Sequence, residues 1–240
     1  MSDQFSRTRL VIGKDGQDKL LASRVAVFGL GGVGAAAVEA LARAGLGSLD
    51  LIDNDQVSLT NINRQFIALH SSVGRNKTEV EKERVLDINP SCRVRVYSTF
   101  FLEDTAEQFD FKEYDYVADC VDTISAKTSL ILKCKEAQTP IICSMGTGNK
   151  VHPEMLKIAD IYDTKICPMA RVMRHEMRKR GVESLKVVYS EEEPLKLSSD
   201  EEVEKKVVSN RPVPGSTSFV PPAAGLIMAG AIVRDILGLK

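Results

Sequence analysis

A glycine-rich turn between a strand-favouring and a helix-favouring segment is the strongest constraint on the fold. Residues 24–28 (RVAVF) favour a strand, and the alanine-rich residues 35–44 favour a helix. Between them, residues 29–34 (GLGGVG) fit the pattern G-x-G-x-x-G. Residues 48–52 (SLDLI) favour a second strand. This order of strand, turn, helix and strand predicts a βαβ unit.

The glycines of this turn predict a nucleotide-binding loop formed by Gly29, Gly31, Gly32 and Gly34. Gly29 permits the tight turn, Gly31 lets a phosphate approach the backbone, and Gly34 allows the helix to pack close to the sheet. The unpaired N–H groups at the start of the helix favour an anion. Asp53 ends the second strand, about 20 residues further on, where an acid can bond ribose hydroxyls. The alternative is a glycine turn that only packs.

The βαβ pattern continues along the first part of the chain. Further segments favour, in order, a helix (76–89), a strand (93–97), a strand (116–118) leading into 119–122, a helix (126–137) and a strand (140–144). This alternation predicts an α/β fold, a Rossmann-like and mostly parallel sheet with helices on both faces.

The second part of the chain is less regular. It favours a basic helix (169–179), a strand (187–189), a charged and solvated loop (191–206), and a segment rich in proline, glycine and serine (212–222). We predict one domain over residues 1–240, with a nucleotide-binding core at 6–150 and a C-terminal extension at 151–240 for substrate binding and dimerisation.

Residues 223–233 are apolar or glycine throughout. As a helix they would span about 16 Å, against the roughly 30 Å of a bilayer core. We therefore predict a buried C-terminal helix and no membrane span, and we expect Gly225 and Gly230 to let it approach a neighbour closely.

Composition limits the function classes. The 32 basic and 33 acidic residues give a net charge of −1, which excludes a globally basic nucleic-acid binder but not a local basic patch. The five cysteines are odd in number and form no C-x-x-C pair, so reduced thiols are expected rather than disulfides or a zinc site. Residues 1–16 are polar and mixed in charge, and no signal peptide is expected. We predict a cytoplasmic protein.

Polar residues after the second strand distinguish ATP from NAD as the ligand. Asp55, Asn61, Arg64, Gln65 and Lys77 form a dense set that a dinucleotide site would not need. An arginine can grip phosphate bidentately, a lysine supplies a point charge, and the amides add hydrogen bonds. An ordinary polar loop followed by a helix N-terminus is the alternative.

Asp122 is the candidate magnesium ligand. It closes residues 119–122 at the end of a strand near the glycine loop, and Mg²⁺ prefers oxygen ligands shared with phosphates. Asp119 precedes it by three residues and is placed within the strand. A helix N-cap is the alternative role for Asp122.

The sequence resembles the adenylation domain of bacterial enzymes that activate sulfur carriers, and that of ubiquitin-activating enzymes. The resemblance covers roughly residues 6–150 and rests on four motifs: GLGGVG (29–34), DNDQVSLTNINRQ (53–65), VGRNK (73–77) and CVDTISAK (120–127). It implies that the chain binds ATP and Mg. The implied contacts are Asp53 to the ribose, Asn61, Arg64, Gln65 and Lys77 to the phosphates, and Asp122 to Mg.

The same resemblance implies a homodimer in which an N-terminal arginine completes the site of the partner subunit. Arg9 is the match in this sequence, and Arg7 is its rival. Arg64, Lys77, Asp122 and Arg9 are the implied catalytic residues.

The second half resembles the branch of this superfamily that dehydrates threonylcarbamoyladenosine in tRNA, over residues 159–181, 187–194 and 214–230. That branch adenylates a carboxylate, and the substrate supplies its own nucleophile, so no enzyme cysteine is needed. Cys167 is the only downstream candidate. Residues 165–186 carry seven basic and two acidic side chains, a net charge of +5. Arg171, Arg174 and Arg178 share one helix face and could follow tRNA phosphates; a solvated face is the alternative.

Three other functions remain open from the sequence. The first is a zinc-free activator that adenylates the C-terminal glycine of a small sulfur-carrier protein, and a sulfur-transfer protein is a further partner of that kind. The second is an NAD-dependent oxidoreductase, which would transfer hydride and use no ATP. The third is a nucleotide-sensing module without turnover.

Overall fold

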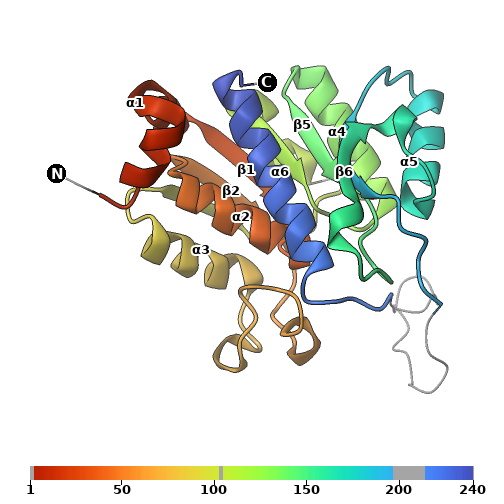
Figure 1. Ribbon diagram of the computed structural model, residues 1–240, viewed down its shortest axis with the longest axis horizontal. Coiled ribbons are helices and arrows are strands. Elements are labelled where there is room, and N and C mark those ends of the chain that lie inside the picture. The colour runs from red at the N-terminus through yellow and green to blue at the C-terminus, as the bar shows by residue number, and fades with distance from the viewer. Residues whose placement is uncertain (1–2, 103–104, 197–213, 240) are drawn as a thin grey trace.

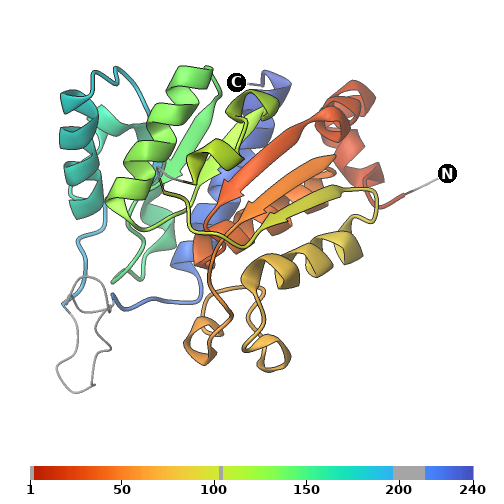
Figure 2. The same cartoon turned by 180° about the vertical axis from the view of Figure 1, so that it is seen from behind.

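Seven strands form a single sheet in the order β3-β2-β1-β4-β5-β7-β6 (Figures 1 and 2). The computed structural model describes residues 3–102, 105–196 and 214–239. The strands are β1 (Arg24–Phe28), β2 (Ser48–Ile52), β3 (Arg93–Tyr97), β4 (Tyr116–Asp119), β5 (Ile141–Ser144), β6 (Leu156–Asp160) and β7 (Lys186–Ser190). Every neighbouring pair is parallel except β6 and β7, which are antiparallel.

Helices cover both faces of this sheet. They are α1 (Ser6–Ala22), α2 (Gly32–Ala44), α3 (Lys77–Ile88), α4 (Ile124–Ala137), α5 (Pro168–Lys179) and α6 (Val220–Leu237). Helices α1, α2 and α6 lie in front of the sheet in Figure 1, and α4 lies in front of it in the reverse view of Figure 2. The predicted α/β fold with a mostly parallel sheet is therefore confirmed.

Two elements were missed by the sequence patterns. Helix α1 is bent at Gly13, which has φ of +75°, and only Gln17 and Leu20 in it are buried, so it shows no continuous apolar stripe. Strand β6 is an edge strand whose residues are mostly half-buried or exposed. Weak burial leaves a weak alternation of apolar residues, and the pattern is then not visible.

The expected solvated loop at 191–206 is wrong at its start. Glu192 is buried, and its two carboxylate oxygens accept hydrogen bonds from the backbone N–H groups of Val151 and His152, each at 2.9 Å. Residues 197–206 of that loop lie outside the described residues, as do residues 212–213 of the predicted segment 212–222.

Helix α6 is longer than the apolar run that predicted it. Its 18 residues, with a mean hydropathy of 1.5, are long and apolar enough to cross a membrane, and it is the one helix of this kind among the described residues. However, 56% of it is buried within the molecule, where it packs mainly against α2. The core helix of a globular protein passes the same test, and the prediction of a buried C-terminal helix is confirmed.

The contact between α2 and α6 depends on one glycine. A Cβ atom on Gly225 would lie 2.1 Å from the carbonyl oxygen of Val33 and 2.9 Å from Cβ of Ala36. A Cβ atom on Gly230 would meet nothing closer than the Arg234 side chain of the same helix, at 3.5 Å. Gly225 therefore permits the close approach that the sequence suggested, whereas for Gly230 that expectation is wrong within the chain.

We predict opposite effects for two substitutions in α6. Gly225→Ala should lower the free energy of unfolding by about 1–3 kcal/mol, because the added methyl group overpacks the α2–α6 contact. Gly230→Ala is the matched control and should raise it by up to about 1 kcal/mol through helix propensity alone. Urea denaturation of the two variants measures both changes; equal stabilities would show that the contact relaxes at no cost.

Candidate active site

The carboxyl ends of the parallel strands open into a pocket of about 1150 Å³. The strand order reverses between β1 and β4, and ligands of such sheets bind in the crevice at this reversal. The loops that follow β2 and lead to α3 project beyond this edge of the sheet in both views (Figures 1 and 2). The volume exceeds the roughly 300–1,000 Å³ of an ordinary small-molecule pocket, which leaves room for two reactants.

The glycine loop lies at one wall of this pocket. Gly29 has φ of +89°, and a Cβ atom on Gly34 would lie 1.8 Å from the carbonyl oxygen of Gly29, so neither position accepts a side chain. Gly31 caps the start of α2 and faces open space, where a phosphate can approach the backbone. Gly32 has a further role, because a Cβ atom there would lie 2.9 Å from Cβ of Pro221 in α6.

Asp53 connects the end of β2 to the glycine loop. One carboxylate oxygen accepts the N–H of Leu30 at 2.6 Å, and the other accepts the N–H of Asp55 at 2.8 Å. Burial raises the pKa of Asp53, while the charge of Lys77 and these two hydrogen bonds oppose the rise. The residue predicted to bind ribose thus also fixes the loop beside it.

The four predicted phosphate-directed residues, Asn61, Arg64, Gln65 and Lys77, all line the pocket, as does Asp55, the further residue predicted to bind the nucleotide. Lys77 is the first residue of α3, is buried, and places its Nζ 2.9 Å from Oδ2 of Asp55. Arg64 donates to the carbonyl of Thr60 at 3.1 Å, and burial lowers the pKa of its guanidinium. Both cations are therefore held in place at one wall of the pocket.

The two amides differ in what they contact. Asn61 accepts the N–H of Ser58 at 3.1 Å and so caps the short turn Leu59–Asn61. Gln65 is only 5% exposed, and its Oε1 has no hydrogen-bond partner within residues 3–102, 105–196 and 214–239. A buried acceptor without a partner is rare, and here it lines a pocket.

The two aspartates at the end of β4 have separate environments. Asp119 is the last residue of the strand, and its carboxylate forms a fully buried ion pair with Lys127, at 2.9 Å. Asp122 is exposed and lines the pocket. The N-cap of α4 is Thr123, so the alternative role of Asp122 as the cap residue is wrong. The described residues contain no group of three or more His, Cys, Asp or Glu side chains able to hold a metal ion without further ligands.

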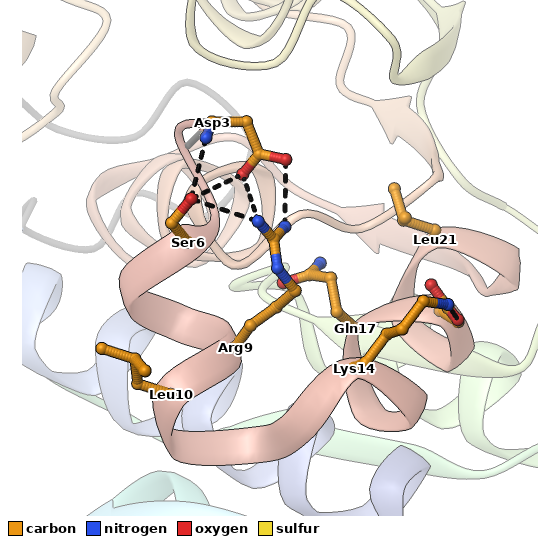
Figure 3. Close-up of a pocket in the computed structure, with 8 residues that line it drawn as sticks. Asp3, Ser6, Arg9, Leu10, Lys14, Gln17 and Leu21 are labelled. Atoms are coloured by element: carbon orange, nitrogen blue, oxygen red, sulfur yellow. Dashed lines mark hydrogen bonds and ion pairs between the residues drawn. The ribbon is translucent and has the colours of Figure 1, made fainter. Parts of the chain in front are cut away.

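Arg9 does not line the nucleotide pocket of its own chain. It lies on α1, where its guanidinium contacts Oδ2 of Asp3 at 3.0 Å and Oγ of Ser6 at 3.1 Å (Figure 3). The next two residues, Leu10 and Val11, are 86% and 85% exposed. Such exposed apolar side chains beside Arg9 are typical of a surface that contacts another chain.

The arginines of α5 are not three equivalent surface charges. Arg174 is half-buried and donates to the carbonyl of Thr164 at 2.8 Å. Arg178 lies over the ring of Tyr162, 5.2 Å from its centroid. Arg171 is exposed. Two of the three predicted tRNA contacts therefore already support the turn at Ile161–Asp163, which the one-face spacing could not indicate.

The sequence patterns missed a second group of pocket residues. These are contributed by the loop after β5 and the segment that leads to α6, and they include Gly148, Asn149, Lys150, Gly215 and Ser216; Cys167, which was already a candidate from the sequence, lies with them just before α5. The residues of the loop after β5 could have been predicted, because β5 itself was predicted and the loop at the carboxyl end of a parallel strand lies at the ligand-binding edge of the sheet.

Residues 5–239 match the ThiF family. The chain belongs to this family. It is 45% identical to a tRNA threonylcarbamoyladenosine dehydratase of Bacillus subtilis (strain 168), over 99% of this chain and 96% of that protein. The structures of Escherichia coli tRNA N6-threonylcarbamoyladenosine dehydratase, TcdA, with AMP and with ATP have TM-scores of 0.88 and 0.86 to this chain. Each is 30% identical, with 98% of this chain and 94% of that chain covered.

We predict that Lys77→Met weakens ATP binding by about 10- to 100-fold, the usual value of one charge-assisted hydrogen bond. Lys82→Met, on the same helix but outside the pocket lining, is the matched control and should bind ATP normally. Isothermal titration with ATP measures both affinities. If Lys77→Met binds ATP as the unsubstituted protein does, then Lys77 only pairs with Asp55.

Proposed function

We propose that this protein is an ATP-dependent tRNA threonylcarbamoyladenosine dehydratase. The observation that carries the proposal is one pocket that is lined both by the phosphate-directed residues Asn61, Arg64, Gln65 and Lys77 and by a second group of polar residues from the loop after β5 and the segment before α6. The similarity to dehydratases over nearly the whole chain supports the same assignment. Since the substrate is a tRNA, we place the protein in the cytoplasm.

The reaction would proceed through an acyl-adenylate. The free carboxylate of threonylcarbamoyladenosine attacks the α-phosphorus of ATP, and pyrophosphate leaves. The neighbouring carbamoyl group then attacks the activated carbonyl carbon, AMP leaves with one carboxylate oxygen, and a proton is released. The net change in the nucleoside is the loss of one water, and no enzyme nucleophile is consumed.

Each predicted residue has a place in this scheme. The N-terminus of α2 and Gly31 would receive phosphate oxygens, while Arg64 and Lys77 would stabilise the charge that develops during transfer. Asp53 would accept the ribose hydroxyls through its remaining lone pairs. Because these groups are already fixed within the chain, the pocket needs little reorganisation when charge develops.

Asp122 would hold Mg²⁺. Its exposed carboxylate at the pocket wall suits a hard cation that takes one or two protein carboxylates and completes its shell with phosphates and water. When bound, Mg²⁺ would neutralise phosphate charge on the nucleotide.

Arg171 is the arginine of the α5 stripe that we propose for tRNA binding. It is exposed, and its neighbours along the helix are already held by Thr164 and Tyr162. A single exposed arginine would contribute a phosphate contact without carrying sequence information.

The direct test is incubation of the protein with ATP and tRNA that carries threonylcarbamoyladenosine, followed by mass spectrometry of the nucleosides. We expect loss of one water from the modified adenosine, and we expect Asp122→Asn to lower the rate by about 10²-fold or more. Asp110→Asn, a substitution outside the pocket, is the control. If the nucleoside is unchanged but a small carrier protein stimulates ATP–pyrophosphate exchange, the alternative function as a carrier-protein activator holds.

We also propose a homodimer in which Arg9 completes the partner's pocket. Two inactive variants, Arg9→Ala and Asp122→Ala, should then restore activity when mixed. Random exchange makes half of the dimers mixed, and each mixed dimer has one intact site of two, so about a quarter of the activity should return. Activity of the mixture is measured after mass spectrometry has demonstrated subunit exchange. No recovery would place Arg9 outside any shared site.

A further inference from the structure

The pocket contains a buried lysine that the nucleotide does not require. Lys150 follows β5, lines the pocket, and is only 2% exposed. It lies in the loop after β5 rather than among the predicted phosphate-directed residues on the loop after β2 and the start of α3. The loop that carries it also supplies Gly148 and Asn149 to the same wall.

The backbone around Lys150 is held firmly from both sides. The N–H of Asn149 donates to the carbonyl of Gly215 at 2.8 Å, and the carbonyl of Asn149 accepts the N–H of Leu195 at 2.8 Å. On the other side, Glu192 accepts the N–H of Val151 at 2.9 Å. The position of the lysine is therefore set by two separate segments of the second half of the chain, one after β7 and one before α6.

The ammonium group of Lys150 is poorly satisfied in contrast. Among the described residues its Nζ makes one hydrogen bond, to the carbonyl of Ser190 at 3.4 Å, although an ammonium has three donors. The nearby carboxylate of Glu192 is occupied by the N–H groups of Val151 and His152. Burial lowers the pKa of Lys150, while Cys167 and Glu192 oppose the shift.

Two other polar atoms of the pocket also have no hydrogen-bond partner in the described part of the chain. These are Oδ1 of Asn149 and Oε1 of Gln65, both buried. Asn149 has a left-handed backbone, with φ of +58°, which costs energy in a residue other than glycine and is typical of functional sites. One unpaired cation and two unpaired acceptors call for a ligand with an anionic group and N–H donors.

We propose that Lys150 binds the carboxylate of the modified adenosine and places it for attack on ATP, with Asn149 and Gln65 accepting the N–H groups of its carbamoyl unit. This inference rests on the proposed dehydratase function. A carboxylate beside urea-type N–H groups is the chemical pattern that these three side chains complement. After adenylation, the same ammonium faces the acyl oxygen, which gains negative charge when the carbamoyl group attacks the carbonyl carbon and AMP departs.

A purely structural lysine is the competing explanation, and the two differ in their stability effects. A structural lysine would be needed for its bond to Ser190, so its removal would destabilise the fold. A lysine retained for binding is a buried charge without an anion, and replacing it by an apolar side chain of similar length would leave stability unchanged or raise it.

The experiment compares the affinity of Lys150→Met for two forms of one tRNA, with and without the threonylcarbamoyl group. The unsubstituted protein should prefer the modified tRNA. The variant should lose about 10- to 100-fold in affinity for the modified form, the value of one hydrogen bond to a charged group. Its affinity for the unmodified form, its ATP affinity and its Tm should not fall. Lys133→Met, an exposed lysine on α4, is the matched control and should retain the preference.

The outcomes separate this inference from the proposed function. If the unsubstituted protein forms no dehydrated nucleoside, the proposed function fails. If the unsubstituted protein forms the dehydrated nucleoside, and Lys150→Met prefers the modified tRNA as strongly as the unsubstituted protein does, the proposed role of Lys150 is overturned. Lys150→Gln, which keeps a donor without charge, replaces the methionine variant should that variant not fold. A fall in Tm of both variants with the preference intact, or failure of both to fold, would make Lys150 structural.

Discussion

The carbonyl oxygen of Gly29 occupies the place where a side chain on residue 34 would begin, 1.8 Å from an added Cβ atom. Because residue 34 is glycine, α2 can start directly against the end of β1 and point its N-terminus into the pocket. A second close backbone contact joins α2 to α6, where Gly225 of α6 lies against the backbone of Val33 in α2. The sheet, α2 and α6 are thus packed in consecutive layers, and the contacts between these layers leave no room for a side chain at Gly34 or Gly225.

This stack links the C-terminal helix to the nucleotide loop. Pro221 at the start of α6 packs on Gly32, and Ser216, in the segment before α6, accepts a hydrogen bond from Asn63 at 3.0 Å. Residues more than 150 positions apart in the chain therefore meet around one pocket. A change in the packing of α6 should therefore shift the phosphate-binding residues of the site, because close-packed interiors transmit strain.

The sequence predicted most of the fold because its parallel strands are buried on both faces. Such strands read as short runs of valine, isoleucine and leucine, and β1, β2 and β5 were found within one residue of their ends. Strand β3 lies at an edge and has no buried residue, and it was found from the alternation of its sequence RVRVY. Strand β6 failed for the opposite reason, since it lies at an edge and buries little. Helix α1 failed because its bend at Gly13 and its few buried residues erase the helical period.

The nucleotide-binding residues could also be predicted, because they lie close together in sequence, in the loop after β1 and in the loop that joins β2 to α3. The separate environments of Asp119 and Asp122 were harder to predict. They differ because Lys127, in the first turn of α4, forms a buried ion pair with Asp119 and leaves the carboxylate of Asp122 exposed. The acceptor end could not be predicted from local pattern. The residues on either side of Lys150 bond to Glu192, Leu195 and Gly215 only after folding, so nothing near the lysine in sequence shows that it is buried.

The distribution of unsatisfied groups between the two ends of the pocket has a mechanistic consequence. At the nucleotide end, Lys77 already pairs with Asp55 and Asp53 with the glycine loop, so ATP meets groups that are held before it arrives. Lys150, Asn149 and Gln65, in contrast, keep hydrogen-bonding positions that no described residue fills and that the second reactant would fill. A buried cation that gains an anion loses a desolvation penalty that the empty site carries. Discrimination against tRNA without the modification would then follow from the same lysine, because such a tRNA brings no carboxylate to the buried ammonium.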